Sequence, residues 1–229
     1  MRNITLVFPY YKSKAFIQHK FNEWRSYSPD VKENLEVIVI DDGSPEGESF
    51  LEFWEETGMN IKLYKIKEDI PWNECGANNL GFAEASYEWV IRCDIDCFIP
   101  NNIIEYFMYN TLQDRSFYTF ATYNLNINEV TWPHYNIYAI QKHIFWEIGG
   151  YDEECSGHYG SDLTFRYRLD KSITQIHLNE LFIVTYPDDE NLHGLSRDAE
   201  WCKEYLNICI NNNAMMPKSY IIFDWERLK

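Results

Sequence analysis

The first hundred residues alternate between short apolar runs and helix-like segments, and this alternation restricts the possible folds more than any other feature of the sequence. Four apolar runs rich in β-branched and aromatic residues are predicted to be strands, at residues 4–8, 35–40, 61–66 and 89–96. Helix-like segments occupy the intervals, at residues 14–27, 50–57 and 73–85. Strands that alternate with helices predict a parallel sheet with helices on both faces. We therefore expect an α/β fold with a mostly parallel central sheet.

The rest of the chain alternates less regularly. Helices are expected at residues 102–112, 142–148 and 198–209, and from about residue 161 to 169. Further strands are expected at residues 117–125, 136–140 and 176–186. Pro9 is expected to end the first strand, because proline cannot donate a ladder hydrogen bond. No repeat, low-complexity tract or linker divides the chain.

The predicted strand at residues 89–96 ends in two carboxylates, Asp94 and Asp96. Alternate residues of a strand share a face, so both side chains should reach one point at its carboxyl end. Open α/β sheets bind their ligands outside these strand ends. Two convergent carboxylates suit a hard divalent cation, which is often shared with substrate phosphates. A solvated Asp-x-Asp turn is the alternative for this motif taken alone.

Composition and charge exclude several classes of function. Hydrophobic residues make up 45% of the 229 residues and aromatic residues 17%, which is enough for a sizeable core. The net charge of −16 disfavours non-specific binding to nucleic acid. The six cysteines lack a CxxC spacing, so neither a zinc knuckle nor a disulfide-rich scaffold is expected. No apolar run approaches the roughly 20 residues of a membrane helix, so we expect a cytoplasmic protein without a transmembrane segment.

Four acidic or small-residue segments follow one another in a characteristic order: VIDDGS (39–44), ANNLG (77–81), RCDID (92–96), and GGYDEE (149–154) with GSD (160–162). Together they resemble the GT-A class of nucleotide-sugar glycosyltransferases, in particular glycosyltransferase family 2. The later half is also similar to galactosyltransferases and chondroitin-polymerase-like enzymes, in which a Gly-Glu-Asp motif precedes a helix and a later His completes a metal site. The resemblance covers about residues 4–198.

This resemblance implies a single GT-A (Rossmann-like) domain over residues 1–229, with a nucleotide-binding half at 1–100 and an acceptor-binding half at 101–229. It implies a metal-dependent enzyme that moves a sugar from a nucleotide-sugar, expected to be a UDP-sugar, to a hydroxyl group with inversion. The expected acceptor is a glycan or a lipid-linked glycan.

The resemblance also assigns nucleotide-sugar contacts, to Pro9, Tyr10, Asp41, Asp42, Asn78, Asn79 and Asp94. Carboxylates can accept hydrogen bonds from base N–H groups and ribose hydroxyls, and amide side chains can donate them. The structural alternative is that the aspartates at residues 41 and 42 form a turn and cap a helix, and that the asparagines serve packing.

Asp94 and Asp96, together with His193, would bind Mn²⁺ or Mg²⁺, which bridges the donor diphosphate. The family resemblance makes Asp96 the more direct ligand and places Asp94 nearer the sugar or ribose. A His ligand suits Mn²⁺ better than Mg²⁺. A structural role for this His is the alternative.

Asp162 is the candidate catalytic base, which would take the proton from the acceptor hydroxyl. The family usually has Glu before this Asp, whereas this chain has Ser161. An ungapped alignment would instead put Gly160 at the base position and leave no base there. Asp162 could also serve only the helix N-terminus. Candidates for sugar contacts on predicted loops are Trp72, Trp132, Tyr135, His158 and Tyr159.

Three other functions stay open at this point. One is sugar transfer to a hydroxymethylated base of DNA, which the acidic charge disfavours. A second is a nucleotidyltransferase, which normally has a Gly-rich loop with Lys or Arg after the first strand, whereas residues 8–12 read FPYYK. The third is a non-catalytic nucleotide- or sugar-binding module, which Ser161 keeps open.

Overall fold

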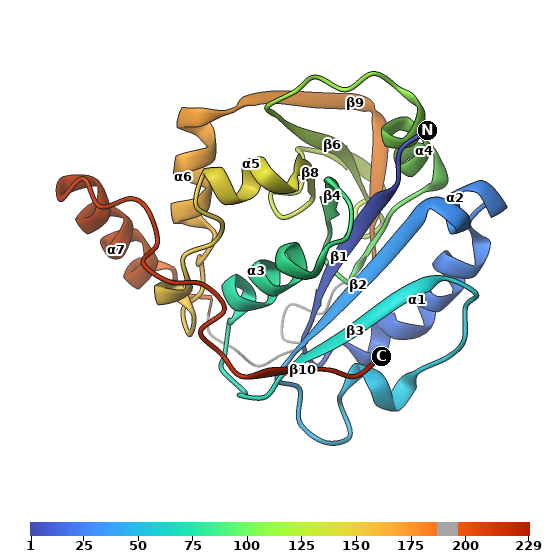
Figure 1. Ribbon diagram of the computed structural model, residues 1–229, viewed down its shortest axis with the longest axis horizontal. Coiled ribbons are helices and arrows are strands. Elements are labelled where there is room, and N and C mark those ends of the chain that lie inside the picture. Colours follow the sequence, from blue (N-terminus) through green and yellow to red (C-terminus); the bar gives the residue numbers. More distant parts are fainter. Residues whose placement is uncertain (187–196) are drawn as a thin grey trace.

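A mixed β-sheet forms the centre of the computed structural model, which describes residues 1–186 and 197–229 (Figure 1). Within these ranges the sheet has ten strands. Nine of them follow the order β10-β3-β2-β1-β4-β8-β6-β9-β5, and the tenth, β7, pairs with β6. The strands are β1 (Ile4–Tyr10), β2 (Leu35–Asp42), β3 (Asn60–Ile66), β4 (Trp89–Arg92), β5 (Cys97–Phe98), β6 (Ser116–Asn124), β7 (Glu129–Thr131), β8 (Tyr138–Gln141), β9 (Thr174–Thr185) and β10 (Trp225–Arg227). The α-helices are α1 (Lys14–Ser26), α2 (Pro29–Asn34), α3 (Glu74–Glu84), α4 (Asn101–Tyr109), α5 (Lys142–Glu147), α6 (Leu163–Ser172) and α7 (Glu200–Asn211).

The strands of the first hundred residues run parallel in the sheet. β1 pairs with β2 on one side and with β4 on the other, and β2 pairs with β3. This confirms the α/β fold predicted from the alternation of strands and helices. Strands from later in the chain pair mostly antiparallel, as β8 does with β4 and β6, although β6 and β9 are parallel. Antiparallel partners need only short connections, so this part lacks the regular alternation of the first.

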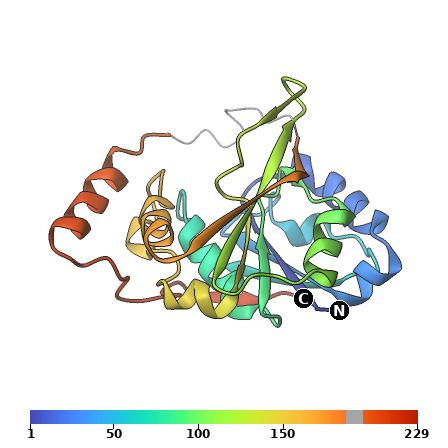
Figure 2. The same ribbon diagram turned by 90° about the horizontal axis from the view of Figure 1, so that it is seen from above.

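Helices cover both faces of the sheet. α1, α2 and α4 lie on one face, and α3, α5 and α6 lie on the other (Figures 1 and 2). Alternate residues of β1 serve the two cores: Leu6 and Phe8 belong to the first, and Val7 to the second. A Cβ atom on Gly81 of α3 would lie 2.3 Å from Val7 Cγ1, so a glycine lets this helix approach β1 closely.

Several predicted boundaries were wrong. β1 continues through Pro9 to Tyr10, since β4 pairs with β1 only as far as Val7 and leaves one side free of a strand. β4 ends at Arg92, and the chain then turns, with the Cys97 N–H donating to the Asp94 carbonyl oxygen at 3.2 Å. The predicted helix at 50–57 is a short 3₁₀ turn, Phe50–Phe53. Helix α2 and the short strands β7 and β10 were not predicted.

A second 3₁₀ turn, Glu153–Cys155, lies between α5 and α6, and α7 extends away from the sheet beside α6 (Figure 2). Across residues 1–186 and 197–229, none of the helices combines the length and the apolar character needed to span a membrane.

Candidate functional site

A cavity of about 320 Å³ lies at the carboxyl ends of β1, β2 and β4. The first half of the chain supplies most of its lining, which includes Pro9, Tyr10, Asp42, Trp72, Glu74, Arg92, Asp94 and Asp96. The second half contributes His134, Asn136, Tyr159 and Arg197. The cavity therefore occupies the edge where an open α/β sheet binds its ligands.

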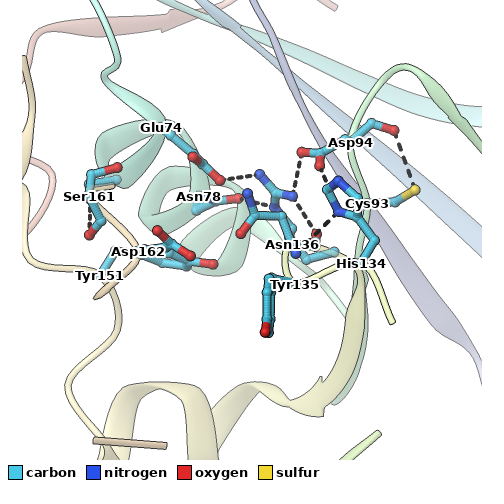
Figure 3. Close-up of polar contacts among 12 residues, drawn as sticks. Glu74, Asn78, Cys93, Asp94, His134, Tyr135, Asn136, Tyr151, Ser161 and Asp162 are labelled. Carbon is cyan, nitrogen blue, oxygen red and sulfur yellow. Dashed lines mark hydrogen bonds and ion pairs between the residues drawn. The ribbon is translucent and has the colours of Figure 1, made fainter. Parts of the chain in front are cut away.

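Arg92, the last residue of β4, connects the two acidic walls of this cavity. Its side chain is 1% exposed, and its guanidinium forms ion pairs of 2.5 Å with Glu74 of α3 and with Asp94. Its Nε also donates to Asn78 Oδ1 at 3.0 Å, and one of its terminal nitrogens donates to the Asn136 carbonyl oxygen. Glu74 and Asp94 lie on different sides of the site (Figure 3). A buried arginine with this many acceptors holds both carboxylates in fixed positions.

Asp94 and Asp96 both line the cavity, but they lie on the turn after β4 and not on a continuous strand. Asp94 Oδ1 is bound to Arg92, and Asp94 Oδ2 lies 3.4 Å from His134 Nδ1. Cys97 Sγ lies 3.4 Å from Asp96 Oδ1 and donates to it, and the Asp96 carbonyl oxygen accepts from the Tyr186 N–H at 2.8 Å. The two carboxylates therefore have different surroundings, although they are one residue apart.

A buried ion pair in α1 supports the turn that carries Asp96. Lys20 Nζ and Glu23 Oε2 are 2.9 Å apart, and both side chains are fully buried. Lys20 also donates to the Cys97 carbonyl oxygen, and Glu23 Oε1 accepts from the Ile99 N–H at 3.1 Å. The segment directly after Asp96 is thus bound to helix α1.

A divalent cation such as Mg²⁺ binds to several oxygen ligands, often carboxylates. In the part of the chain that the structure describes, no group of three or more His, Cys, Asp or Glu side chains is arranged to hold a metal ion. His193, the expected third ligand, lies outside the described residues. The two aspartates nevertheless offer the oxygen ligands of a hard cation, and Mg²⁺ is commonly held by one or two carboxylates together with water and phosphate oxygens. This donor set fits such an ion.

The adjacent aspartates at the end of β2 differ in their partners. Asp41 is fully buried, and its oxygens accept hydrogen bonds from the Ser44 N–H at 3.0 Å, the Ser49 hydroxyl at 2.5 Å and the Phe50 N–H at 2.9 Å. Asp42 lines the cavity and accepts from Asn73 Nδ2 at 3.0 Å. Burial raises the pKa of Asp42 well above its usual range, although the Asn73 hydrogen bond opposes this shift.

Of the predicted nucleotide contacts on β1 and α3, two line the cavity and two are buried away from it. Pro9 and Tyr10 line the cavity, and the Tyr10 hydroxyl donates to the Glu48 carbonyl oxygen at 2.7 Å. Asn78 is buried against Arg92, and Asn79 is bonded to the backbone of Tyr151 at 2.9 and 3.0 Å. Both asparagines are fully buried and are absent from the cavity lining.

Asp162 is the residue directly before α6. Its side chain makes no capping hydrogen bond with the helix N-terminus, but its Oδ2 forms an ion pair of 3.1 Å with Arg166 Nε one turn later. The Arg166 guanidinium lies 3.6 Å from the centre of the Tyr135 ring. Asp162 also acts electrostatically on Glu74, so it lies near the cavity although it does not line it.

Glu74 begins α3 and has an unusual acidity. Burial raises the pKa of its carboxyl to about 7, with Asp94 and Asp162 adding to the rise and the Arg92 guanidinium opposing it. Its side chain retains 24% of its exposure, on the side that lines the cavity.

The residues of the site that sequence reasoning missed include Glu74, Arg92, His134, Asn136 and Arg197. For Arg92 a signal was present, because a charged residue in an apolar strand two positions before Asp94 needs a buried partner. His134 and Asn136 lie on the irregular loop before β8, although Asn136 was expected to begin that strand.

Comparison with known proteins gives a consistent result. Residues 5–174 match the family described as Glycosyl transferase family 2. Among solved structures, the chain is similar to the mannosyltransferase PcManGT from Pyrobaculum calidifontis, in complex with GDP-Man and Mn²⁺, with a TM-score of 0.64 and 17% identity over 85% of this chain and 60% of that one. It is also similar to S. aureus TarS 1-349 in complex with UDP-GlcNAc, with a TM-score of 0.71 and 13% identity over 92% of this chain and 67% of that one.

A further similar structure is GalNAc-T7 with UDP, GalNAc and Mn²⁺, with a TM-score of 0.63 and 12% identity over 91% of this chain and 48% of that one. At these identities the solved structures establish the shared fold. The chain spans about 60% of the length of PcManGT.

Proposed function

The chain belongs to glycosyl transferase family 2, and we propose that it transfers a sugar from a nucleotide-sugar, most simply a UDP-sugar, to a hydroxyl group of a glycan or lipid-linked glycan. The observation that carries this proposal is the cavity at the strand ends, where Asp94 and Asp96 meet the predicted nucleotide contacts Pro9, Tyr10 and Asp42.

The charge of the cavity supports a metal-dependent reaction. Its lining includes four carboxylic acids, Asp42, Glu74, Asp94 and Asp96, against two arginines. Even with Asp42 neutral, the lining carries more negative than positive charge. A diphosphate would be repelled by such a wall unless a cation lay between them. We therefore propose that Asp96 and Asp94, with His193, hold Mn²⁺ or Mg²⁺.

When bound, the cation would neutralise charge on the leaving nucleoside diphosphate. Asp96 would hold the cation, while Asp94, already bound to Arg92, would accept hydrogen bonds from the ribose or the sugar. Asp162 would take the proton from the acceptor hydroxyl as that oxygen bonds to the anomeric carbon and the bond to the diphosphate oxygen breaks. Attack from the face opposite the leaving group inverts the anomeric configuration.

The two halves of the chain would then have separate tasks, with residues 1–100 binding the nucleotide and residues 101–229 the acceptor. A second cavity of about 270 Å³ supports this division, because residues after position 100 form its lining. Trp132 and Tyr135 line it and are 90% and 71% exposed. Aromatic faces of this kind can pack against the apolar faces of sugar rings. His134 lines both cavities and connects them.

Binding of nucleotide-sugars provides the test. Ligands that bind only the folded state raise the melting temperature by mass action. We expect one UDP-sugar to raise it in a manner that requires Mn²⁺, and Asp96→Asn to abolish this shift. Asp114→Asn is the matched control, since that carboxylate is exposed and outside the cavity lining.

A second variant tests the proposed base. Asp162→Asn should leave the Mn²⁺-dependent shift unchanged and stop transfer. If no nucleotide-sugar shifts the wild-type melting temperature with or without Mn²⁺, the transferase proposal fails and the binding-module alternative is also weakened. If Asp162→Asn keeps full transfer activity, another group is the base.

A further inference from the structure

Glu74 is a carboxylate of the cavity that neither the nucleotide nor the metal assignment uses. It begins α3, whereas Asp94 and Asp96 follow β4, so it forms a different wall of the same cavity. Its Oε1 is fixed by Arg92 at 2.5 Å, and the side chain remains 24% exposed toward the cavity. A hydrogen-bond acceptor held in a fixed orientation on a helix can accept hydrogen bonds from the hydroxyl groups of a ligand.

The charge around Arg92 is not balanced by its partners. One buried guanidinium holds two carboxylates, those of Glu74 and Asp94. Above pH 7, where the Glu74 carboxyl is mostly ionised, one positive charge among two negative ones leaves an excess negative charge on this part of the wall. The Arg92 side chain is 1% exposed and that of Glu74 is 24% exposed, so the carboxylate presents more surface to a ligand than the guanidinium does. Ionised carboxylates accept hydrogen bonds but donate none.

The position of Glu74 relative to the other two acids suggests which part of a ligand it meets. Both Asp94 and Asp162 act electrostatically on its carboxyl, so both lie near Glu74. In the close-up Asp162 lies on the same side of the site as Glu74, away from Asp94 (Figure 3). Under the proposed function the transferred sugar must lie between the diphosphate at Asp94 and Asp96 and the base at Asp162.

We infer that Glu74 accepts hydrogen bonds from hydroxyl groups of the transferred sugar, held in place by Arg92, and that it selects a neutral hydroxylated sugar over an acidic one. This inference rests on the proposed function. A sugar carboxylate would meet a wall that already has excess negative charge and would be repelled. A neutral sugar hydroxyl would instead donate to a fixed, charged acceptor, and such hydrogen bonds are among the stronger ones.

The test compares matched donors that differ in one group. UDP-glucose and UDP-glucuronate share the nucleotide and the ring and differ in a hydroxymethyl or a carboxylate group. The pair GDP-mannose and GDP-mannuronate serves if the guanosine nucleotide binds better. Affinities of the wild type and of Glu74→Gln are measured in Mn²⁺ by calorimetry at pH 8, where the Glu74 carboxyl is mostly ionised, together with the affinity for the free nucleoside diphosphate.

We expect the wild type to prefer the neutral sugar, and Glu74→Gln to weaken its binding by about tenfold because a charged hydrogen-bond acceptor becomes neutral. The ratio of the affinity for the neutral sugar nucleotide to that for the uronate should fall by a similar factor. Affinity for the free nucleoside diphosphate should change less than twofold, because it lacks the sugar. Glu84→Gln is the control, since Glu84 lies at the other end of α3 and accepts from the Tyr64 hydroxyl at 2.7 Å.

A second variant separates charge from contact. Glu74→Asp keeps the negative charge and withdraws it by one methylene, so it should retain the discrimination against the uronate and lose part of the affinity for the neutral sugar. Equal weakening of the sugar nucleotide and the free diphosphate by Glu74→Gln would overturn the inference, as would an unchanged preference. Absence of any nucleotide-sugar binding by the wild type would overturn the proposed function and this inference with it.

Discussion

The buried ion pair under the acidic turn allows a quantitative prediction. Lys20→Met keeps the length of the side chain and removes its charge, leaving the carboxylate of Glu23 without its cation. Both side chains are fully buried, and Lys20 Nζ also lies 4.4 Å from the centre of the Phe8 ring. Removing one partner of a buried pair costs about 3–5 kcal/mol, because the other charge stays buried and uncompensated.

The structure places this variant near the lower end of that range. Glu23 Oε1 keeps two hydrogen bonds, from the Tyr27 hydroxyl at 2.7 Å and from the Ile99 N–H at 3.1 Å. We therefore expect the free energy of unfolding to fall by about 3 kcal/mol. Adding Glu23→Gln removes the uncompensated charge and keeps an acceptor for both donors, so the double variant should recover at least about 1 kcal/mol.

Urea-induced unfolding, followed by tryptophan fluorescence and far-ultraviolet circular dichroism, measures both changes. Coincident transitions by the two probes are needed before a two-state free energy is assigned. A loss below about 1 kcal/mol for Lys20→Met would refute the reasoning about the uncompensated charge. A double variant no more stable than Lys20→Met would refute it as well.

Three further predictions concern other parts of the molecule. Burial raises the folded-state pKa of Glu74 from 4.5 to about 7, so between these pH values the folded state binds more protons than the unfolded state and its stability falls as pH rises. Glu74→Gln should remove about 1–3 kcal/mol of this fall, measured by urea unfolding at pH 4.5 and 7.5. Gly81→Ala should destabilise by about 1–3 kcal/mol, since the new Cβ would lie 2.3 Å from Val7 Cγ1, and adding Val7→Ala should recover part of the melting temperature. The exposed pair of Arg115 and Glu147, with hydrogen bonds of 2.8 and 2.7 Å, should show a coupling energy below about 1 kcal/mol in a double-mutant cycle, and 1 M NaCl should reduce it.

The first half of the fold could be predicted because its strands are buried on both faces. Runs such as residues 37–40 are apolar throughout, and parallel strands with helices on both faces require this pattern. The long strand β9 was also expected, at residues 176–186, although much of it is exposed and its side chains vary in character. β7 and β10 are three residues long, and a segment of that length has no periodicity to detect.

The site could be predicted in part, for a related reason. A strand end predicts where carboxylates gather, but not which atoms they bind. Asp41 and Asp42 are equivalent in the sequence. In the structure Asp41 accepts hydrogen bonds from Ser44, Ser49 and Phe50, whereas Asp42 lines the cavity. Such a difference depends on the loop conformation, which the adjacent residues do not specify. The roles assigned to Asp96, Asp162 and His193 stay predictions until the variants are measured.

The pairing of β10 with β3 has a consequence for the order in which the protein can fold during synthesis. β3 is otherwise the edge strand of the parallel part of the sheet, and Trp225–Arg227 pair with Tyr64–Ile66. Leu63 adds backbone hydrogen bonds with Leu228 and Lys229. A ribosome releases residues 60–66 before residues 225–229, so the nascent chain carries this strand edge unpaired until residues 225–229 emerge. Unpaired edges are sites of wrong association between chains. A nascent-chain chaperone would therefore have its greatest effect on yield while this edge waits for its partner.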